Sequence, residues 1–287
     1  MTLSKAPHFL IQCLLTFATI FISTSLQAQE RWFQVEVSIF SNEGITDRTQ
    51  EEWQANRIKL SYPKNLRRLN SVADFFLPDS TVENNQVLID DLPRGALERE
   101  ALNTVIEKTR PKRKNNERRF KLINLAREPY FQLPAVESDF QQTNQTLQRS
   151  PDHRLLFHGN WRQVVTQKSE TSPILIEGGL AYGNQHELQG SLTVRFNQNE
   201  DRVVLDANLW LTEFSIVQNT EENWSLPLIP EDLQNKESVL ESTLSYFPNN
   251  VYHMNQTRDM RSMEFHYLDH PALGLVVLVK PINLSEL

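Results

Sequence analysis

The densest group of side chains able to bind a metal ion or transfer a proton is EFHYLDH, at residues 264–270. A helical zinc site would need His266 and His270 on successive turns of one helix. The alternation of apolar and polar residues instead predicts a strand, in which four residues span about 13 Å. That span is too long for one ion to hold both imidazoles, so we expect no metal here. We expect Asp269 or His270 to bond the turn backbone before Pro271.

The sequence gives little support for covalent or cofactor-dependent catalysis. Its one cysteine, Cys13, lies in an apolar amino-terminal run. It has no Gly-x-Ser-x-Gly elbow and no glycine-rich phosphate loop. Histidines occur singly, and the sequence cannot show which of them meets a carboxylate in space. We therefore expect no catalytic residue, no cofactor and no enzymatic activity.

Four polar residues near the carboxyl end are candidates for ligand binding: Arg258, Arg261, Glu264 and His266. If they lie on one strand, Arg258, Glu264 and His266 share a face and Arg261 points the other way. Exposed arginines could bind ligand carboxylates as a fork. Alternatively, an arginine could form a buried pair that holds the strand to its neighbours. We favour the buried pair for Arg261 and leave both interpretations open.

Other residues of recognition type are expected to be structural. The one basic run, residues 110–119, is interpreted as a solvated loop, with contact to an anionic polymer or acidic partner as the alternative. Trp32, Trp161 and Trp210 are expected to pack in the core.

The amino-terminal segment predicts export. Lys5 precedes an apolar run at residues 9–22, and the small residue Ala28 suits cleavage before Gln29. The run is too short for a membrane span, so residues 1–28 are interpreted as a cleavable signal peptide. The mature chain, 29–287, would contain no cysteine, and we expect it in a bacterial periplasm with no membrane span. The net charge of −7 gives no argument for nucleic acid.

The rest of the chain predicts an α+β fold, mainly an antiparallel β-sheet with a few packed helices in one domain. Residues 32–40 alternate as a half-buried strand. The segment 41–150 is punctuated by prolines, with one helix after Asp91 and a weaker one at 138–147. Further strands are expected at 154–165, 174–176 (ending in a Gly178-Gly179 turn), 192–196, 203–211, within 251–268, and at 273–279 as a central strand.

Three stretches together resemble the CsiV family. They are WFQVEVSIF at residues 32–40, RLLFHGNWRQ at 154–163 and MRSMEFHYLDHPALGLVVLVKP at 260–281. The last is long and specific. The chain departs from the family pattern at Asp259, where a second arginine is usual, and around 195–201, which lacks an aromatic-histidine pattern.

The resemblance implies a periplasmic protein of Gram-negative bacteria that binds peptidoglycan and is tied to cell-shape integrity. It further implies support of an outer-membrane lipoprotein that activates a bifunctional penicillin-binding synthase. The expected function is thus a non-enzymatic, peptidoglycan-binding accessory to cell-wall synthesis. A hydrolase acting on the wall or on an envelope peptide is the alternative.

Overall fold

The computed structural model describes residues 30–44, 48, 53–71, 127–218, 224–234 and 245–284. The chain divides into two compact units, Met1–Arg31 and Trp32–Leu287. The strands lie in the second unit: β1 (Trp32–Asn42), β2 (His153–Val164), β3 (Ile174–Tyr182), β4 (Gln185–Phe196), β5 (Val203–Ser215), β6 (Phe247–Met260), β7 (Phe265–Asp269) and β8 (Leu273–Ile282). The predicted signal segment 1–28, the helix after Asp91 and the basic run 110–119 lie outside the described residues.

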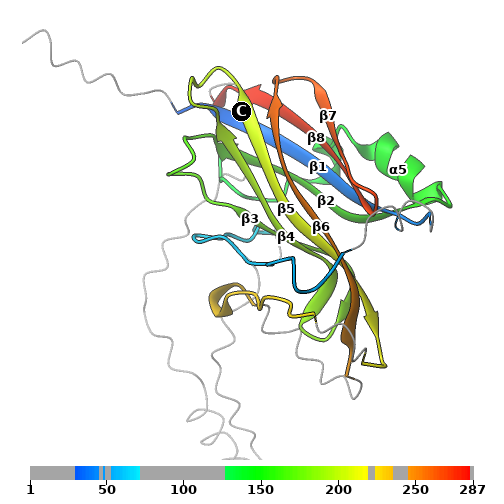
Figure 1. Cartoon of the computed structure of the whole chain (residues 1–287). Coiled ribbons are helices and arrows are strands. Elements are labelled where there is room, and N and C mark those ends of the chain that lie inside the picture. The colour runs from blue at the N-terminus through cyan, green and yellow to red at the C-terminus, as the bar shows by residue number, and fades with distance from the viewer. Residues whose placement is uncertain are drawn as a thin grey trace, which may run out of the picture. The chain divides into compact units, whose positions relative to one another are not determined.

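These strands form two antiparallel four-stranded sheets (Figure 1). Sheet A has the order β2-β1-β8-β7, and sheet B has the order β3-β4-β5-β6. Inward side chains of both sheets join one apolar core. At one pair of edges, Gln256 Nε2 in β6 donates to the carbonyl of Asp269 at the end of β7, at 2.8 Å. The prediction of a mainly antiparallel sheet is therefore confirmed.

Among the described residues, helices contribute less than the α+β prediction expected. The helical elements that lie wholly within the described ranges are α5 (Gln141–Arg149) and two short 3-10 turns, η3 (Ala135–Glu137) and η4 (Glu231–Leu233). Helix α5 confirms the weaker predicted helix, a few residues further along the chain. Within the described ranges, no helix has the length and hydropathy needed to cross a bilayer.

Strand β1 is buried on both faces, so the prediction of a half-buried strand is wrong. Val35 and Val37 point into the core between the sheets. Gln34, Glu36 and Ser38 on the opposite face are buried as well, because residues 135–149 lie over them. Ser38 Oγ donates to Asn144 Oδ1 of α5 at 2.6 Å. The alternation was therefore that of a central strand whose outer face bonds to a covering segment.

Two strands contain irregularities. The register between β1 and β2 shifts after Ile39, and Leu156 of β2 packs in the core. The pair Gly178-Gly179 forms an irregularity within β3, not the predicted turn. A Cβ at Gly178 would collide with the carbonyl of Leu156, so glycine is required by close approach of the backbones.

The remaining strand predictions fare better. Strand β8 pairs with β1 and β7, which confirms a central strand at 273–279. The strands predicted at 192–196 and 203–211 lie in β4 and β5, which form a hairpin in which the amide of Asn197 donates to the carbonyl of Arg202 at 3.0 Å. Trp161 and Trp210 are fully buried, as predicted, while Trp32 is half-buried.

Candidate functional site

The four residues predicted to bind ligand lie around the turn between β6 and β7. Arg258 is in β6, Arg261 and Glu264 are in the turn, and His266 is in β7. They do not share one polar strand, because β6 ends at Met260 and β7 starts at Phe265. The predicted division of faces is therefore wrong, although the four residues remain within a stretch of nine that joins sheet B to sheet A.

The backbone of this turn is fixed by two contacts. The amide of Met263 donates to the carbonyl of Val279 in β8 at 2.9 Å. His266 Nε2 lies 3.2 Å from the carbonyl oxygen of Arg261. Met263 adopts a left-handed conformation with φ 68°, which is unusual for a bulky side chain. The turn thus has a defined shape from which its side chains project.

Arg258, Arg261 and Glu264 are exposed, while His266 is half-buried. Exposure of Arg261 contradicts the interpretation that it forms a buried pair in the sheet. With the described carboxylates, neither Arg258 nor Arg261 forms an ion pair. As far as the described residues are concerned, these exposed guanidinium groups are available for a ligand.

Apolar side chains next to these arginines are also exposed, a feature that sequence reasoning missed. Met263, Phe265 and Tyr267 expose 63%, 62% and 47% of their surface. The alternation of residues 263–267 was interpreted only as the pattern of a strand, with no prediction of which face is exposed. Sheet A places β7 at an edge, where Phe265 and Tyr267 pair with Leu278 and Val276 of β8 on the face away from sheet B.

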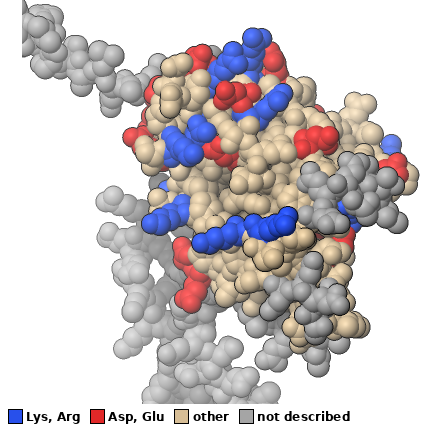
Figure 2. Space-filling view, viewed as in Figure 1, with Lys and Arg blue, Asp and Glu red and all other residues tan. Residues whose placement is uncertain are grey.

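Charges of both signs are mixed over the surface in this view (Figure 2). Arg258 is followed by the exposed Asp259 in β6. Such a surface does not attract anions through a broad positive field. Recognition by this face would rest on individual side chains.

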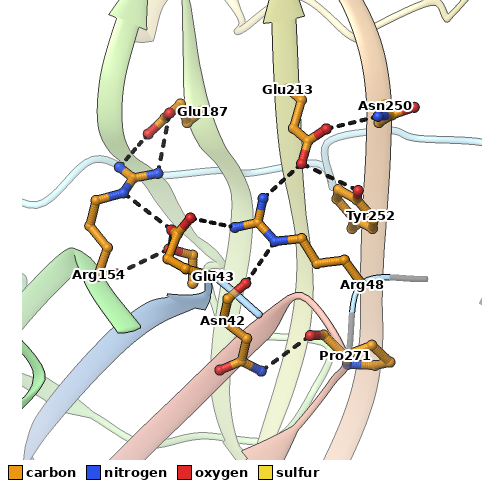
Figure 3. A network of polar contacts seen from close by, with 10 residues as sticks. Asn42, Glu43, Arg48, Arg154, Glu187, Glu213, Asn250, Tyr252 and Pro271 are labelled. Carbon is orange, nitrogen blue, oxygen red and sulfur yellow. Dashed lines mark hydrogen bonds and ion pairs between the residues drawn. The ribbon is translucent and has the colours of Figure 1, made fainter. Parts of the chain in front are cut away.

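A second polar cluster joins the two sheets at the other end of the strands (Figure 3). Arg48 bonds Glu43 at 3.0 Å and Glu213 of β5 at 2.7 Å. Arg154 of β2 bonds Glu43 at 3.3 Å and Glu187 of β4 at 2.7 Å. Alternating carboxylates and guanidiniums therefore form a continuous chain of ion pairs that connects sheet A with sheet B.

The groups around Glu213 and Glu43 complete this cluster. Asn250 Nδ2 and the Tyr252 hydroxyl of β6 donate to Glu213, at 2.8 and 3.3 Å. Burial raises the pKa of Glu43, but bonds from Ser41, Arg48 and Arg154 outweigh it, so the pKa lies below its ordinary range. Since each arginine already bonds two carboxylates, we interpret this cluster as a link between the sheets. No sequence motif predicts this cluster, because its members are spread between residues 41 and 252.

Histidine–carboxylate pairs do form in the fold, but the most buried one has a structural geometry. His158 Nε2 lies 2.9 Å from Glu36 Oε1, which also accepts the hydroxyl hydrogen of Ser138. In a catalytic triad the imidazole contacts the hydroxyl, whereas here the carboxylate lies between the two. Glu36 also accepts the amides of Asp139 and Phe140, at 2.8 and 3.2 Å. It therefore holds the segment that enters α5.

The two histidines considered for zinc have different surroundings. The extended conformation predicted at His266 is confirmed by β7. His270 is buried beside the Trp53 ring, with centroids 5.4 Å apart. Its Nδ1 accepts the amide of Ala272 at 3.2 Å, which confirms the predicted side-chain bond to the turn. In the part of the chain that the structure describes, no three His, Cys, Asp or Glu side chains gather as metal ligands.

Burial sets the protonation of His270. Burial, together with a smaller effect of the neighbouring His253, lowers the pKa of the imidazole to about 4. His270 is therefore neutral near pH 7 and acts as a hydrogen-bond acceptor in the turn.

Comparison with known proteins identifies one family. No curated protein and no solved structure matches the chain with significant similarity. One family model matches residues 10–282, almost the whole chain, and its description is "Peptidoglycan-binding protein, CsiV". The match includes both the β6–β7 turn and the strands that position it, and the chain therefore belongs to the CsiV family of peptidoglycan-binding proteins.

Proposed function

We propose that this protein binds peptidoglycan through the surface around the β6–β7 turn, without cleaving it. The observation that carries the proposal is the family match over residues 10–282. That match includes the end of β6 and the turn after it, where Arg258 and Arg261 respectively are exposed.

The chemistry of this surface suits the peptide part of the polymer. Stem peptides of peptidoglycan carry carboxylates, and a guanidinium can bind a carboxylate through two parallel hydrogen bonds. Arg258 and Arg261 are the donors for such bonds, and Glu264 is an acceptor for ligand amines. His266 contacts the Arg261 carbonyl, so its role would be to position the turn that carries Arg261.

The cellular role that we propose follows the family resemblance. The protein would act in the periplasm after removal of residues 1–28. There it would support an outer-membrane lipoprotein that activates a bifunctional penicillin-binding protein. Pull-down of the purified lipoprotein by the mature chain tests this partner, and failure to retain it in the presence and absence of peptidoglycan would refute it.

Substitution of Arg261 tests the proposed surface. Arg261→Ala should weaken binding to purified sacculi about tenfold, since a charge-assisted bond contributes roughly 1.5–3 kcal/mol before solvent screening. Its melting temperature should stay at the wild-type value because the side chain is exposed. Arg57→Ala, which also removes an exposed arginine, is the matched control and should bind normally.

The two outcomes separate clearly. Normal binding by Arg261→Ala would exclude this residue from the site. A lower melting temperature with proportionate loss of binding would assign it a structural role instead. Incubation of sacculi with the wild-type protein should release no soluble fragments, and fragment release would favour the hydrolase alternative.

A further inference from the structure

Three of the large apolar side chains that the structure shows exposed belong to one short segment. Phe265 and Tyr267 lie on the outer face of β7, and Met263 lies in the turn just before this strand, whereas Leu268 turns into the core. Single exposed apolar residues are common, but a contiguous group marks a binding surface. We define these three residues as the β7 shelf.

The aromatic rings of the β7 shelf are held from behind by buried rings. Phe265 packs against Phe140, which precedes α5, with centroids 5.6 Å apart. Tyr267 lies parallel to Phe40 of β1, with centroids 6.3 Å apart and an interplanar angle of 5°. Phe40 and Phe140 are both buried. Because the shelf rings are fixed before any ligand arrives, binding would cost little side-chain entropy.

A glycine makes room for one of these supports. Phe40 lies opposite Gly274 in the pairing of β1 with β8, and a Cβ at Gly274 would overlap its ring. The ring can therefore lie over β8 and reach towards Tyr267. This close approach gives Gly274 a role in the shape of the shelf.

Polar groups border the shelf. The Tyr267 hydroxyl donates to Asp269 Oδ1 at 2.7 Å, which leaves the second carboxylate oxygen free to accept. Arg261 and Glu264 are exposed on the adjoining turn. Apolar ring faces bordered by a few hydrogen-bonding groups are the composition of a ligand site.

We propose that the β7 shelf binds the glycan strand of peptidoglycan, with sugar rings stacked on Phe265 and Tyr267. The inference rests on the proposed peptidoglycan-binding function. A pyranose ring has an apolar C–H face and a polar hydroxyl edge, which match the rings and the bordering polar groups respectively. The shelf lies on an edge strand, so a polymer can pass across it without presenting a chain end.

A protein partner fits this surface less well. Three side chains of this size offer at most about 600 Å² of contact. A stable protein interface buries roughly 800 Å² on each partner. A narrow strand of sugars, in contrast, needs only a few rings to stack on.

Glycan strands freed of stem peptides by amidase digestion are the decisive probe. Wild-type protein should bind them, and Phe265→Ala should bind them about tenfold more weakly. Met263→Asn should also weaken binding, and asparagine tolerates the left-handed backbone at this position. Leu228→Ala, which truncates an exposed apolar residue elsewhere, is the control. Melting curves should show that all three variants are folded.

The results distinguish this inference from the function on which it rests. If wild-type protein fails to bind intact sacculi, both are overturned. If it binds sacculi but not the freed strands, or if Phe265→Ala and Met263→Asn bind the strands normally, the glycan shelf alone is overturned. Loss of self-association in these variants with unchanged glycan binding would also overturn it, in favour of a second copy of the chain as occupant.

Discussion

Substitution of Glu36 tests how the fold attaches α5 to sheet A. The helix has no side-chain cap of its own, since Phe140 occupies its N-cap position. Glu36 of β1 provides the missing acceptor from a position 104 residues earlier in the chain. We predict that Glu36→Gln keeps the volume of the side chain but loses stability.

The size of the loss follows from the donors around the carboxylate. Four groups donate to Glu36: the Ser138 hydroxyl, the amides of Asp139 and Phe140, and the His158 ring. The oxygen of a glutamine side chain can accept two of these four bonds. Its NH₂ group is itself a donor, so it cannot accept the other two. Each unsatisfied buried donor costs about 1–3 kcal/mol. The two amides cannot turn away, so we expect the free energy of unfolding to fall by about 3 kcal/mol.

The pKa of Glu36 gives the loss a pH dependence. Burial raises this pKa, but bonds from His158, Ser138, Asp139 and Phe140 outweigh it and place it below the ordinary 4.5. A carboxylate with a lowered folded-state pKa stabilises the protein above its unfolded pKa, and that contribution is lost as the pH falls through the folded pKa. The difference in the free energy of unfolding between wild type and Glu36→Gln should therefore have its full size at pH 7 and become smaller below about pH 4.

Thermal unfolding measures this prediction. A loss of 3 kcal/mol corresponds to a melting temperature lower by about 6–12 °C. Faster hydrogen exchange at the amides of Asp139 and Phe140 would locate the change. Glu170→Gln alters an exposed carboxylate and should melt as wild type. An unchanged melting temperature for Glu36→Gln would refute the capping role.

Three further changes probe other parts of the structure. His270→Asn keeps an acceptor for the Ala272 amide. In the wild type, the free energy of unfolding should fall by about 1.4 kcal/mol per pH unit as the pH drops from 6.5 to 4, because only unfolded His270 takes up a proton in that range. The variant should lack this slope, and an identical slope in denaturant titrations would contradict the prediction. Gly274→Ala should cost about 1–3 kcal/mol because its Cβ overlaps the Phe40 ring, and a normal urea midpoint would show that the ring can move. Arg48→Met should lower the free energy of unfolding by about 1–2 kcal/mol. The loss is moderate because Glu43 and Glu213 keep 33% and 35% of their side-chain surface exposed to solvent, which screens the ion pairs. A larger loss of stability at high salt than at low salt would be inconsistent with an ionic link.

Local patterns predicted the strands better than they predicted what covers them. The alternation in β1, β4 and β5 identified these strands because inward and outward residues differ along each of them. The long-range pairing of β1 with β8 has no local signal, and neither has the cover of residues 135–149 over β1. Glu36 was therefore expected at a solvated face, whereas it is buried and bonded to the entry of α5.

The candidate site shows the same limit. Arg258 and Arg261 were named from residue type, but their exposure depended on where β6 ends. The turn after Met260 interrupts the segment 251–268, which was expected to be extended. Phe265 and Tyr267 were missed because their alternation predicts a strand but does not tell which of its faces is exposed. The pairing of β7 with β8, in which Leu268 enters the core, shows that these rings face outward.

Co-sedimentation with intact, protein-free sacculi tests the central claim most directly. Purified protein lacking residues 1–28 would be titrated against sacculi and measured in pellet and supernatant. Peptidoglycan binding predicts saturable recovery in the pellet, weakened by Arg261→Ala and not by Arg57→Ala. Folded wild-type protein that remains in the supernatant at every sacculus concentration would contradict the account.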